Sequence, residues 1–179
     1  MFWVWVVSLP ITFLNAATRD PELGAADYIG WALFAIGFLF EAAADHQKNA
    51  FSNDPDNKGK LLNTGVWYYS RHPNYFGEIC LWTGLFIACT PVFESPGGTE
   101  WGYISVLSPV ITFMLLMFLS GVPLAEERYD KRFGSDPVYV EYKYSTSPLI
   151  PMPPSLYACL PDCGKLLLCE FPSYSKEFK

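Results

Sequence analysis

Residues 111–121, ITFMLLMFLSG, decide the fold, because a helix formed by this segment would have no polar face. A helix of a soluble globular protein normally has one. The segment lies within a longer apolar stretch, residues 101–124, and two further apolar stretches cover residues 25–44 and 76–93. A helix needs about 20 apolar residues to cross the core of a bilayer. The pattern therefore predicts membrane-spanning helices in these three stretches.

The N-terminal residues 1–17, MFWVWVVSLPITFLNAA, are a fourth and shorter candidate span. A signal peptide begins with positive charge, but here no Lys or Arg precedes the apolar run, and Pro10 interrupts it. We interpret the segment as a first membrane helix with a kink at Pro10. The expected fold is an all-α polytopic transmembrane helical bundle of about four spans, followed by a cytosolic helical C-terminal tail.

Basic residues gather in every second segment between the expected spans. Lys48, Lys58, Lys60 and Arg71 lie between the second and third spans, and seven Lys and Arg residues follow the fourth span. The other two connections contain Arg19 alone. Because cytosolic loops carry an excess of Lys and Arg, we predict a multi-pass protein with both termini in the cytosol.

The composition excludes several classes of protein. Charged residues are 17% of the chain, against about a quarter in a soluble domain. The net charge of -6 argues against nucleic-acid binding. The five cysteines imply no disulfide framework, and no metal site is expected because Cys159, Cys163 and Cys169 lack paired spacing and a nearby His. The length predicts one membrane domain, residues 1–154, and a tail, residues 155–179.

Residues 65–78, GVWYYSRHPNYFGE, place polar groups directly at the start of the third span. Arg71 and His72 precede a proline that suits the first position of a helix. The free amides and the dipole of a helix start favour an anion. Asn74 and Glu78 are four residues apart and share one face. A phosphate or carboxylate would fit here, but an interfacial anchor in the lipid headgroups fits the same residues, and both interpretations remain open.

The second span continues into a charged helical face formed by Glu41, Asp45 and Lys48, at spacings of four and three. A solvated amphipathic extension explains this spacing. Glu41, however, lies within one turn of the apolar run, and an ionisable group at membrane depth is a candidate for function. These three residues are therefore supporting candidates for a site.

Residues 126–134, EERYDKRFG, follow the fourth span and form a predicted helix. Glu127 and Lys131 make a favourable pair at spacing four, while Arg128 and Arg132 share one face. One interpretation is a basic amphipathic helix on the membrane surface. The other is that these arginines and the following tyrosines complete a nucleotide site with the polar residues ahead of the third span, because both segments are predicted to be cytosolic.

A further helix is expected after this one. Gly134 is typical of a helix end, and Asp136 and Pro137 are typical of an N-cap and a first helical residue. The helix that begins there would place Tyr139 and Tyr142 near one another.

Three motifs, taken in order, resemble a known superfamily. The run SRHPNYFGE at residues 70–78 resembles the signature of the steroid 5-alpha-reductase C-terminal domain. FEAAADHQKNAF at residues 40–51 and EERYDKRFGSDPVYVEYKYSTSPLIP at residues 126–151 resemble membrane relatives of that family. The resemblance covers residues 5–154. Full-length members have more spans, so the chain is expected to lack their N-terminal ones.

The resemblance implies a reductase of the membrane bilayer that uses NADPH to reduce a carbon–carbon double bond of a lipid-like, hydrophobic substrate. If the source is eukaryotic, it implies the endoplasmic reticulum. No catalytic residue is assigned. The implied cofactor-binding residues are Arg71, His72, Asn74, Tyr75, Glu78, Arg128, Arg132, Tyr139 and Tyr142. The supporting candidates are Glu41, Asp45 and Lys48, from the spacing given above, and the paired glutamates Glu126 and Glu127.

The isoprenylcysteine carboxyl methyltransferases resemble part of the same pattern. They share the RHPxYxG stretch and the later paired glutamates, and their cofactor is S-adenosylmethionine. Asn74 and Glu78 within NYFGE, together with FEAAADHQK, favour the reductase. A third hypothesis is a truncated, non-catalytic membrane protein. Binding of NADPH, of S-adenosylmethionine or of neither separates the three hypotheses.

Overall fold

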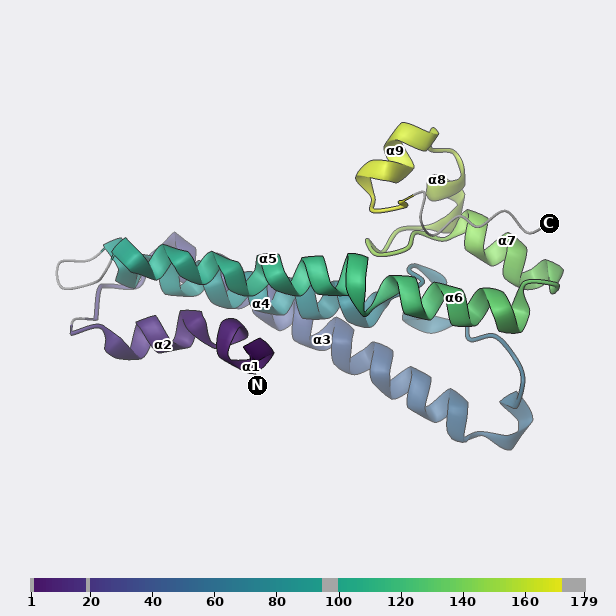
Figure 1. Ribbon diagram of the computed structural model, residues 1–179, viewed down its shortest axis with the longest axis horizontal. Helices are drawn as coiled ribbons and strands as arrows, with labels where there is room; N and C mark the ends of the chain where they lie inside the picture. The colour runs from purple at the N-terminus through teal and green to yellow at the C-terminus, as the bar shows by residue number, and fades with distance from the viewer. Residues whose placement is uncertain (1, 19, 95–99, 172–179) are drawn as a thin grey trace. The chain divides into compact units, whose positions relative to one another are not determined.

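The structure is a computed structural model that describes residues 2–18, 20–94 and 100–171. These residues form helices joined by loops and include no strand (Figure 1). Within the described part of the chain, three helices are long and apolar enough to cross a membrane: α3 (Ala25–Asn53), α4 (Pro73–Glu94) and the composite helix Trp101–Phe133. The all-α membrane class is therefore confirmed, and these helices contain the three longer predicted spans.

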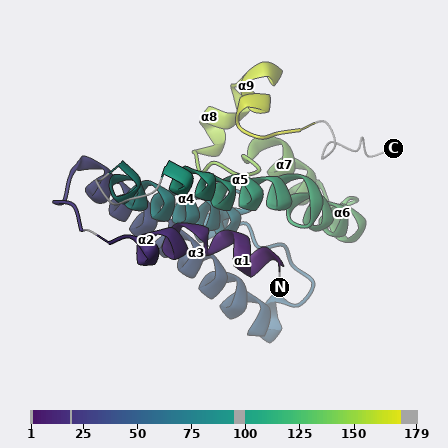
Figure 2. The same cartoon turned by 60° about the vertical axis from the view of Figure 1, so that its left-hand side comes forward.

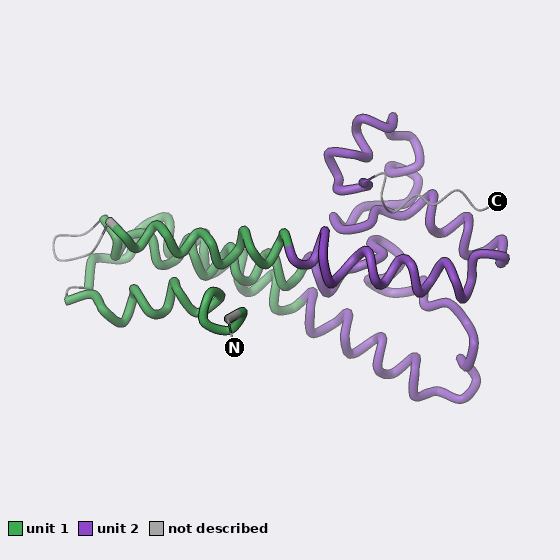
Figure 3. Tube along the Cα trace, viewed as in Figure 1, with its two compact units in different colours: residues 1–39, 77–114 green, residues 40–76, 115–179 purple. Residues whose placement is uncertain are grey.

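The chain divides into two compact units (Figure 3). Unit 1 consists of residues 1–39 and 77–114, and unit 2 of residues 40–76 and 115–179. Helices α3 and α4 contribute residues to both units. The predicted division at residue 154 and the cytosolic location of the termini are not tested by this arrangement and stay predictions.

The predicted first span is helical but divided. It consists of α1 (Phe2–Val7) and α2 (Leu9–Ala16), which meet at Ser8. Pro10 lies in the first turn of α2, where its missing N–H breaks no hydrogen bond, so the break comes before the proline. Helices of six and eight residues are each shorter than the bilayer core. A fourth span therefore stays a prediction.

Glycines allow α3 and α4 to touch through their backbones within unit 1. A Cβ atom added to Gly37 would lie 2.5 Å from the backbone nitrogen of Leu81, and one added to Gly84 would lie 2.5 Å from that of Phe34. Small residues at such contacts are typical of helix packing in membranes, where close van der Waals contact replaces the hydrophobic effect as the driving force. Ala substitution at either glycine would force the helices apart.

The third long helix changes its geometry along its length. Its parts are η3 (Glu100–Val106), α5 (Leu107–Met114), a π-helix (Leu115–Leu119) and α6 (Val122–Phe133). The Ser120 N–H donates to the Leu115 carbonyl at 2.8 Å, which is the wide π pattern. A Cβ atom on Gly121 would lie 2.3 Å from the Leu116 oxygen, so only glycine fits. Pro123 then occupies the first turn of α6.

The predicted helix boundaries around the polar segments are confirmed. Helix α4 begins at Pro73, and the Gly134 N–H closes α6 on the Asp130 carbonyl at 2.9 Å. The Asp136 side chain accepts a hydrogen bond of 2.9 Å from the Val138 N–H at the start of α7 (Pro137–Ser145). These local signals place α6 and α7 in succession within unit 2.

After α7 the chain, which is green to yellow in Figure 2, packs against the segment that precedes α4. The Arg71 N–H donates to the Ser147 carbonyl at 2.9 Å, and the Met152 N–H donates to the Tyr69 carbonyl at 3.0 Å. Two short helices follow: α8 (Pro154–Ala158) and α9 (Asp162–Leu167). Unit 2 thereby brings the two polar segments of the sequence into direct contact.

Candidate functional site

A buried ionic network lies at the centre of unit 2. We use the name ion network for Arg71, His72, Glu126, Asp130, Lys143 and Glu170. Arg71 Nη1 lies 3.4 Å from Glu126 Oε2, and Lys143 Nζ lies 3.3 Å from the same oxygen. Lys143 Nζ also lies 2.6 Å from Asp130 Oδ1. Arg71, Glu126 and Lys143 are each 4% exposed. Burial of an unpaired charge is very unfavourable, so the opposite charges must be assembled for unit 2 to fold.

Arg71 directs its charge to protein carboxylates. Its Nη2 lies 2.6 Å from Glu170 Oε2, and its Nη1 donates to the Lys143 carbonyl at 3.1 Å. Burial acts to lower the pKa of the Arg71 guanidinium, but Glu126 and Glu170 outweigh this effect and raise it above its ordinary value. Arg71 is therefore a permanent cation.

The ion network also orients two aromatic rings. His72 Nε2 and Glu126 Oε1 share a hydrogen bond of 2.8 Å, and the His72 ring stacks on Tyr75 with the centroids 5.3 Å apart. The Tyr139 hydroxyl donates to Asp130 Oδ1 at 2.5 Å. Because the network holds these groups on α4, α6 and α7 together, it fixes the side chains that surround it.

The tyrosines of α7 act as hydrogen-bond donors. The Tyr142 hydroxyl donates to the Trp67 carbonyl at 2.5 Å. Burial raises the pKa of Tyr142 well above its ordinary value. Burial and the hydrogen bond to Asp130 raise the pKa of Tyr139 in the same direction. Both phenols therefore stay protonated at neutral pH. Together with Arg71, His72 and Glu126 they line a narrow pocket of only about 10 Å³, which is room for about one water molecule.

A larger pocket of about 210 Å³ adjoins the network at His72. We call it the basic pocket; its lining residues are Lys48, Trp67, His72, Asn74, Tyr75, Ala125, Arg128, Tyr129 and Arg132. Lys48, Arg128 and Arg132 are exposed cations. Among the described residues that line this pocket there is no carboxylate. The pocket is therefore suited to an anion.

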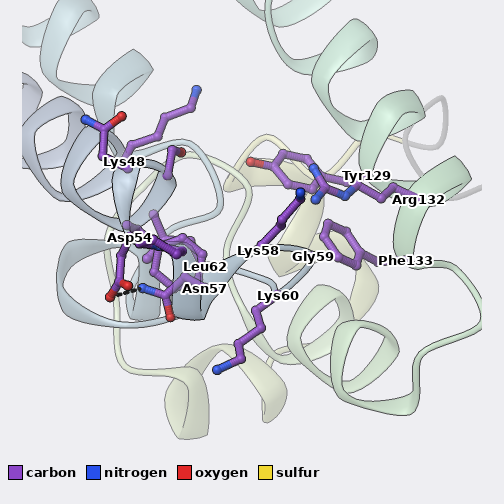
Figure 4. A pocket seen from close by; sticks show the side chains of 14 residues that line it. Lys48, Asp54, Asn57, Lys58, Gly59, Lys60, Leu62, Tyr129, Arg132 and Phe133 are labelled. Carbon is purple, nitrogen blue, oxygen red and sulfur yellow. Dashed lines mark hydrogen bonds between the residues drawn. The ribbon is translucent and has the colours of Figure 1, made fainter.

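A second hollow, which we call the loop pocket, has a volume of about 380 Å³ and shares Lys48, Tyr129 and Arg132 with the basic pocket. Figure 4 shows Tyr129 and Arg132 on α6 facing the loop that follows α3. This loop adds Lys58 and Lys60 to the lining. Its acidic member, Asp54, uses its two carboxylate oxygens within the loop to accept hydrogen bonds from residues 56 and 57. The two pockets together form a continuous basic surface.

Aromatic faces accompany these cations. The Trp67 indole nitrogen donates to the Ala44 carbonyl at 3.0 Å, which fixes the ring, and Lys48 Nζ lies 5.6 Å from the ring centroid. Tyr75 and Tyr129 line the same pocket. Flat aromatic side chains next to cations can stack with heteroaromatic rings while the cations hold phosphates.

The predicted site residues fall into separate groups. Five line the basic pocket: His72, Asn74, Tyr75, Arg128 and Arg132. Three others line the narrow pocket: Arg71, Tyr139 and Tyr142. Glu78 belongs to unit 1. Of the supporting residues, Lys48 lines the basic pocket, Glu126 joins the ion network, and Glu127 pairs with Lys131 at 2.9 Å on an exposed face. Glu41 and Asp45 line none of these pockets. A cofactor contact remains a prediction for every one of these residues.

The sequence patterns do not identify Trp67, Tyr129 or Glu170 as site residues. A signal exists for Tyr129, because Glu126, Tyr129 and Phe133 follow at spacings of three and four and form the inner face of α6. A carboxylate on such a face requires a buried cation as its partner. No comparable signal exists for Glu170, which reaches Arg71 from 99 residues away.

Unit 1 contains a pocket of a different kind, with a volume of about 360 Å³. Its lining is mostly apolar and includes Trp31, Phe34 and Leu85. The acidic Asp27 lies at this pocket and accepts a hydrogen bond of 2.8 Å from the Gly24 N–H. A mostly apolar lining with few polar groups is typical of a site for a hydrophobic molecule.

Known proteins resemble the chain over most of its length. It is 30% identical over 135 residues to a probable O-methyltransferase of Ustilaginoidea virens. The matched region covers 71% of this chain and 44% of that protein. It is 27% identical over 180 residues to a Delta(14)-sterol reductase of Gibberella zeae, covering 79% of this chain and 36% of that protein. For a Delta(14)-sterol reductase of Aspergillus fumigatus the identity is 28% over 172 residues, with 74% and 32% covered.

These relatives include two reductases and a methyltransferase, so they support the superfamily but do not select a branch of it. The chain spans less than half the length of each of them. No solved structure matches the chain. Residues 1–146 match the family described as protein of unknown function (DUF1295). Because this match covers most of the 179 residues, the chain belongs to the DUF1295 family.

Proposed function

We propose that the chain is a membrane-bound reductase that binds NADPH in the basic pocket and the loop pocket. The observation that carries this proposal is the charge of the basic pocket, where Lys48, Arg128 and Arg132 stand without a carboxylate among the described lining residues. NADPH carries several negative charges on its phosphate groups. S-adenosylmethionine carries a positive sulfonium, a positive ammonium and a single carboxylate, so its net charge is positive and three neighbouring cations disfavour its binding.

The lining residues fit the parts of NADPH. Arg128 and Arg132 would hold phosphate oxygens, since a guanidinium offers paired N–H donors in a fixed fork. Lys48 would add a mobile point charge next to Trp67. The ring faces of Trp67 and Tyr129 would contact the base or the nicotinamide. Bound NADPH supplies a hydride to a carbon–carbon double bond of the substrate.

In this proposal the ion network positions the wall of the pocket. Glu126 holds His72 through the 2.8 Å hydrogen bond, and His72 stacks on Tyr75. Both rings line the basic pocket. A wall whose rotamers are fixed by buried partners holds a ligand more exactly in place than a flexible one does.

The substrate in this proposal is a hydrophobic molecule that enters from the bilayer. Two observations support this class: the three helices with the length and apolarity of membrane spans, and the similarity to two Delta(14)-sterol reductases. Reaction within the membrane would keep water away from the hydride. Location in the endoplasmic reticulum is part of the same proposal, since it rests on the resemblance to membrane reductases.

The second candidate is an S-adenosylmethionine-dependent methyltransferase, which the 30% identity to a probable O-methyltransferase supports. This activity would need carboxylates to balance the positive charges of its cofactor. Glu126 is already paired with Arg71, His72 and Lys143, and Glu127 faces Lys131. The electrostatics of unit 2 therefore favour NADPH.

The test is a pair of titrations on the full chain in detergent or nanodiscs, with NADPH followed by fluorescence and S-adenosylmethionine by calorimetry. We expect saturable binding of NADPH. Arg132→Ala, which changes both pockets, should weaken it about tenfold, the loss expected for one charge-assisted hydrogen bond. Lys131→Ala on the same helix is the matched control and should bind as the wild type does. Saturable binding of S-adenosylmethionine without binding of NADPH would replace the reductase by the methyltransferase.

A further inference from the structure

Glu170 joins the ion network from a segment outside the family match. The match ends at residue 146, and Glu170 comes after α9 in the C-terminal tail. Its Oε2 lies 2.6 Å from Arg71 Nη2, which is shorter than the 3.4 Å between Arg71 and Glu126. The Tyr157 hydroxyl donates to the same oxygen at 2.7 Å. The tail thus supplies a carboxylate to an arginine of the family domain.

The carboxylate uses only half of one edge of the Arg71 guanidinium. Nη2 binds Glu170, whereas Nε is buried and has no hydrogen-bond partner among the described residues. Nε and Nη2 together form the edge that takes two oxygens of a phosphate or carboxylate in the bidentate geometry. An unpaired buried donor is unfavourable. The Arg71 edge would therefore be better satisfied by a phosphate than by Glu170.

The charge balance of the ion network also favours replacement of Glu170 by an anionic group of a ligand. Arg71 and Lys143 are balanced by Glu126 and Asp130 without any contribution from the tail. Glu170 is thus an additional anion, and an anionic group of a ligand could take its place on Arg71 without disturbing the other pairs. The narrow pocket lined by Arg71 shares Trp67, His72 and Tyr129 with the basic pocket, so the two are adjacent.

A local helix cap positions the backbone next to Glu170. Cys169, with a φ of 69°, adopts the left-handed conformation typical of the residue that follows a helix C-cap, and the N–H groups of Cys169 and Glu170 donate to the carbonyls of Leu166 and Lys165 at 3.1 and 3.0 Å. Phe171 on the other side contacts Phe118, with the ring centroids 4.9 Å apart. The side-chain contacts of Glu170 and Phe171 therefore dock the end of the tail, while local hydrogen bonds set the turn that joins these residues to α9.

We propose that Glu170 is an autoinhibitory anion, which occupies the edge of Arg71 and which a phosphate group of the ligand displaces. The proposal rests on the proposed function in that NADPH supplies the phosphate. It assigns two states to the tail: bound to Arg71 without ligand, and released when a phosphate takes the Nε–Nη2 edge. Ligand binding and tail docking then oppose each other, and each weakens the other by the same factor.

The experiment compares Glu170→Gln with Asp162→Asn. The control makes the same change, from a carboxylate to an amide, at an exposed position of the same tail. Both variants are made in the full chain and placed in nanodiscs. We expect Glu170→Gln to bind NADPH about fivefold more tightly or better, and Asp162→Asn to bind as the wild type does. Amide hydrogen exchange of residues 155–171 should be faster in Glu170→Gln. It should also become faster in the wild type when NADPH or inorganic pyrophosphate is added.

A milder variant guards against misfolding of Glu170→Gln. Tyr157→Phe keeps the carboxylate and removes only the hydroxyl that donates to it, so the gain in NADPH affinity should have the same sign and about half the free energy. Weaker NADPH binding in either variant would show that the tail belongs to the binding site and would overturn the proposal. Unchanged affinity with unchanged exchange would overturn it as well.

A failure of the proposed function would give a different set of binding and exchange results. If no variant binds NADPH, the reductase proposal fails, and the exchange measurement with pyrophosphate alone decides the tail. Faster exchange of residues 155–171 with pyrophosphate then supports displacement of Glu170 by a phosphate. Exchange that pyrophosphate leaves unchanged rejects it.

Discussion

The ion network and the basic pocket are both rich in cations, yet they treat charge in opposite ways. In the network, Arg71 and Lys143 are buried and each contacts two carboxylates. In the pocket, Arg128 and Arg132 are exposed and no carboxylate is among the described lining residues. Helix α6 serves both regions. The contrast indicates that the network holds the fold of unit 2, while the pocket is available to a ligand.

The short spacing along α6 explains how one helix can do both. Glu126 and Asp130 are four residues apart and point to the network, whereas Arg128 and Arg132 are also four apart and lie two positions away. A shift of two residues turns a side chain through about 200°, which separates the two sets on opposite faces. Variants on the two faces should therefore affect stability and binding separately.

The largest effect is expected from Arg71→Ala. Removal of this cation leaves Glu126 buried and Glu170 partly buried with fewer partners, and such a change costs about 3–5 kcal/mol. The free energy of unfolding in detergent should fall by that amount. Arg128→Ala is the matched control and should stay within about 0.5 kcal/mol of the wild type. An Arg71→Ala protein of normal stability would show that the ion network does not hold unit 2 together.

The second largest effect is expected from salt, which should weaken binding at the basic pocket without weakening the ion network. Exposed charges are screened strongly and buried pairs weakly, so raising the salt from about 50 to about 500 mM should weaken NADPH binding about tenfold. The unfolding temperature should change little over the same range. The double variant Arg128→Ala, Arg132→Ala should show a flatter dependence of NADPH affinity on salt. If salt lowered stability and affinity in parallel, the distinction between a buried network and an open pocket would not hold.

Local signals in the sequence predict much of this structure. Pro73, Gly134 and Asp136 mark helix ends that depend only on neighbouring residues, and all three are confirmed. The apolar lengths of the spans are equally local. The sequence predicts only that Arg71 and the α6–α7 segment lie on the same side of the membrane. The fold of unit 2 brings them into direct contact.

Other features depend on contacts that the sequence does not display. The π-helix at residues 115–119, LLMFL, is one example, because nothing in this apolar run distinguishes it from the α-helix that precedes it. The sequence places Arg71 at a helix mouth that suits an external anion, but in the structure the protein's own carboxylates fill that role. Glu170 could not be predicted, because nothing local connects a tail residue with an arginine so distant in the chain.

The smallest effect tests a single hydrogen bond at the edge of the ion network. Tyr139→Phe removes the hydroxyl that donates to Asp130, while Lys143 still contacts that carboxylate, so the free energy of unfolding at neutral pH should fall by only about 1 kcal/mol.

Burial and this hydrogen bond raise the pKa of Tyr139 in the folded protein. The folded state therefore holds the phenolic proton more tightly than the unfolded state does, whose pKa is about 10. The resulting stability is fully present below that pH and is lost as the pH rises above it. Thermal unfolding at about pH 8 and about pH 10.5 should show a shallower alkaline decline in Tyr139→Phe than in the control Tyr144→Phe, whose ring is exposed. Equal declines would mean that Tyr139 shares its proton with solvent and lies outside the network.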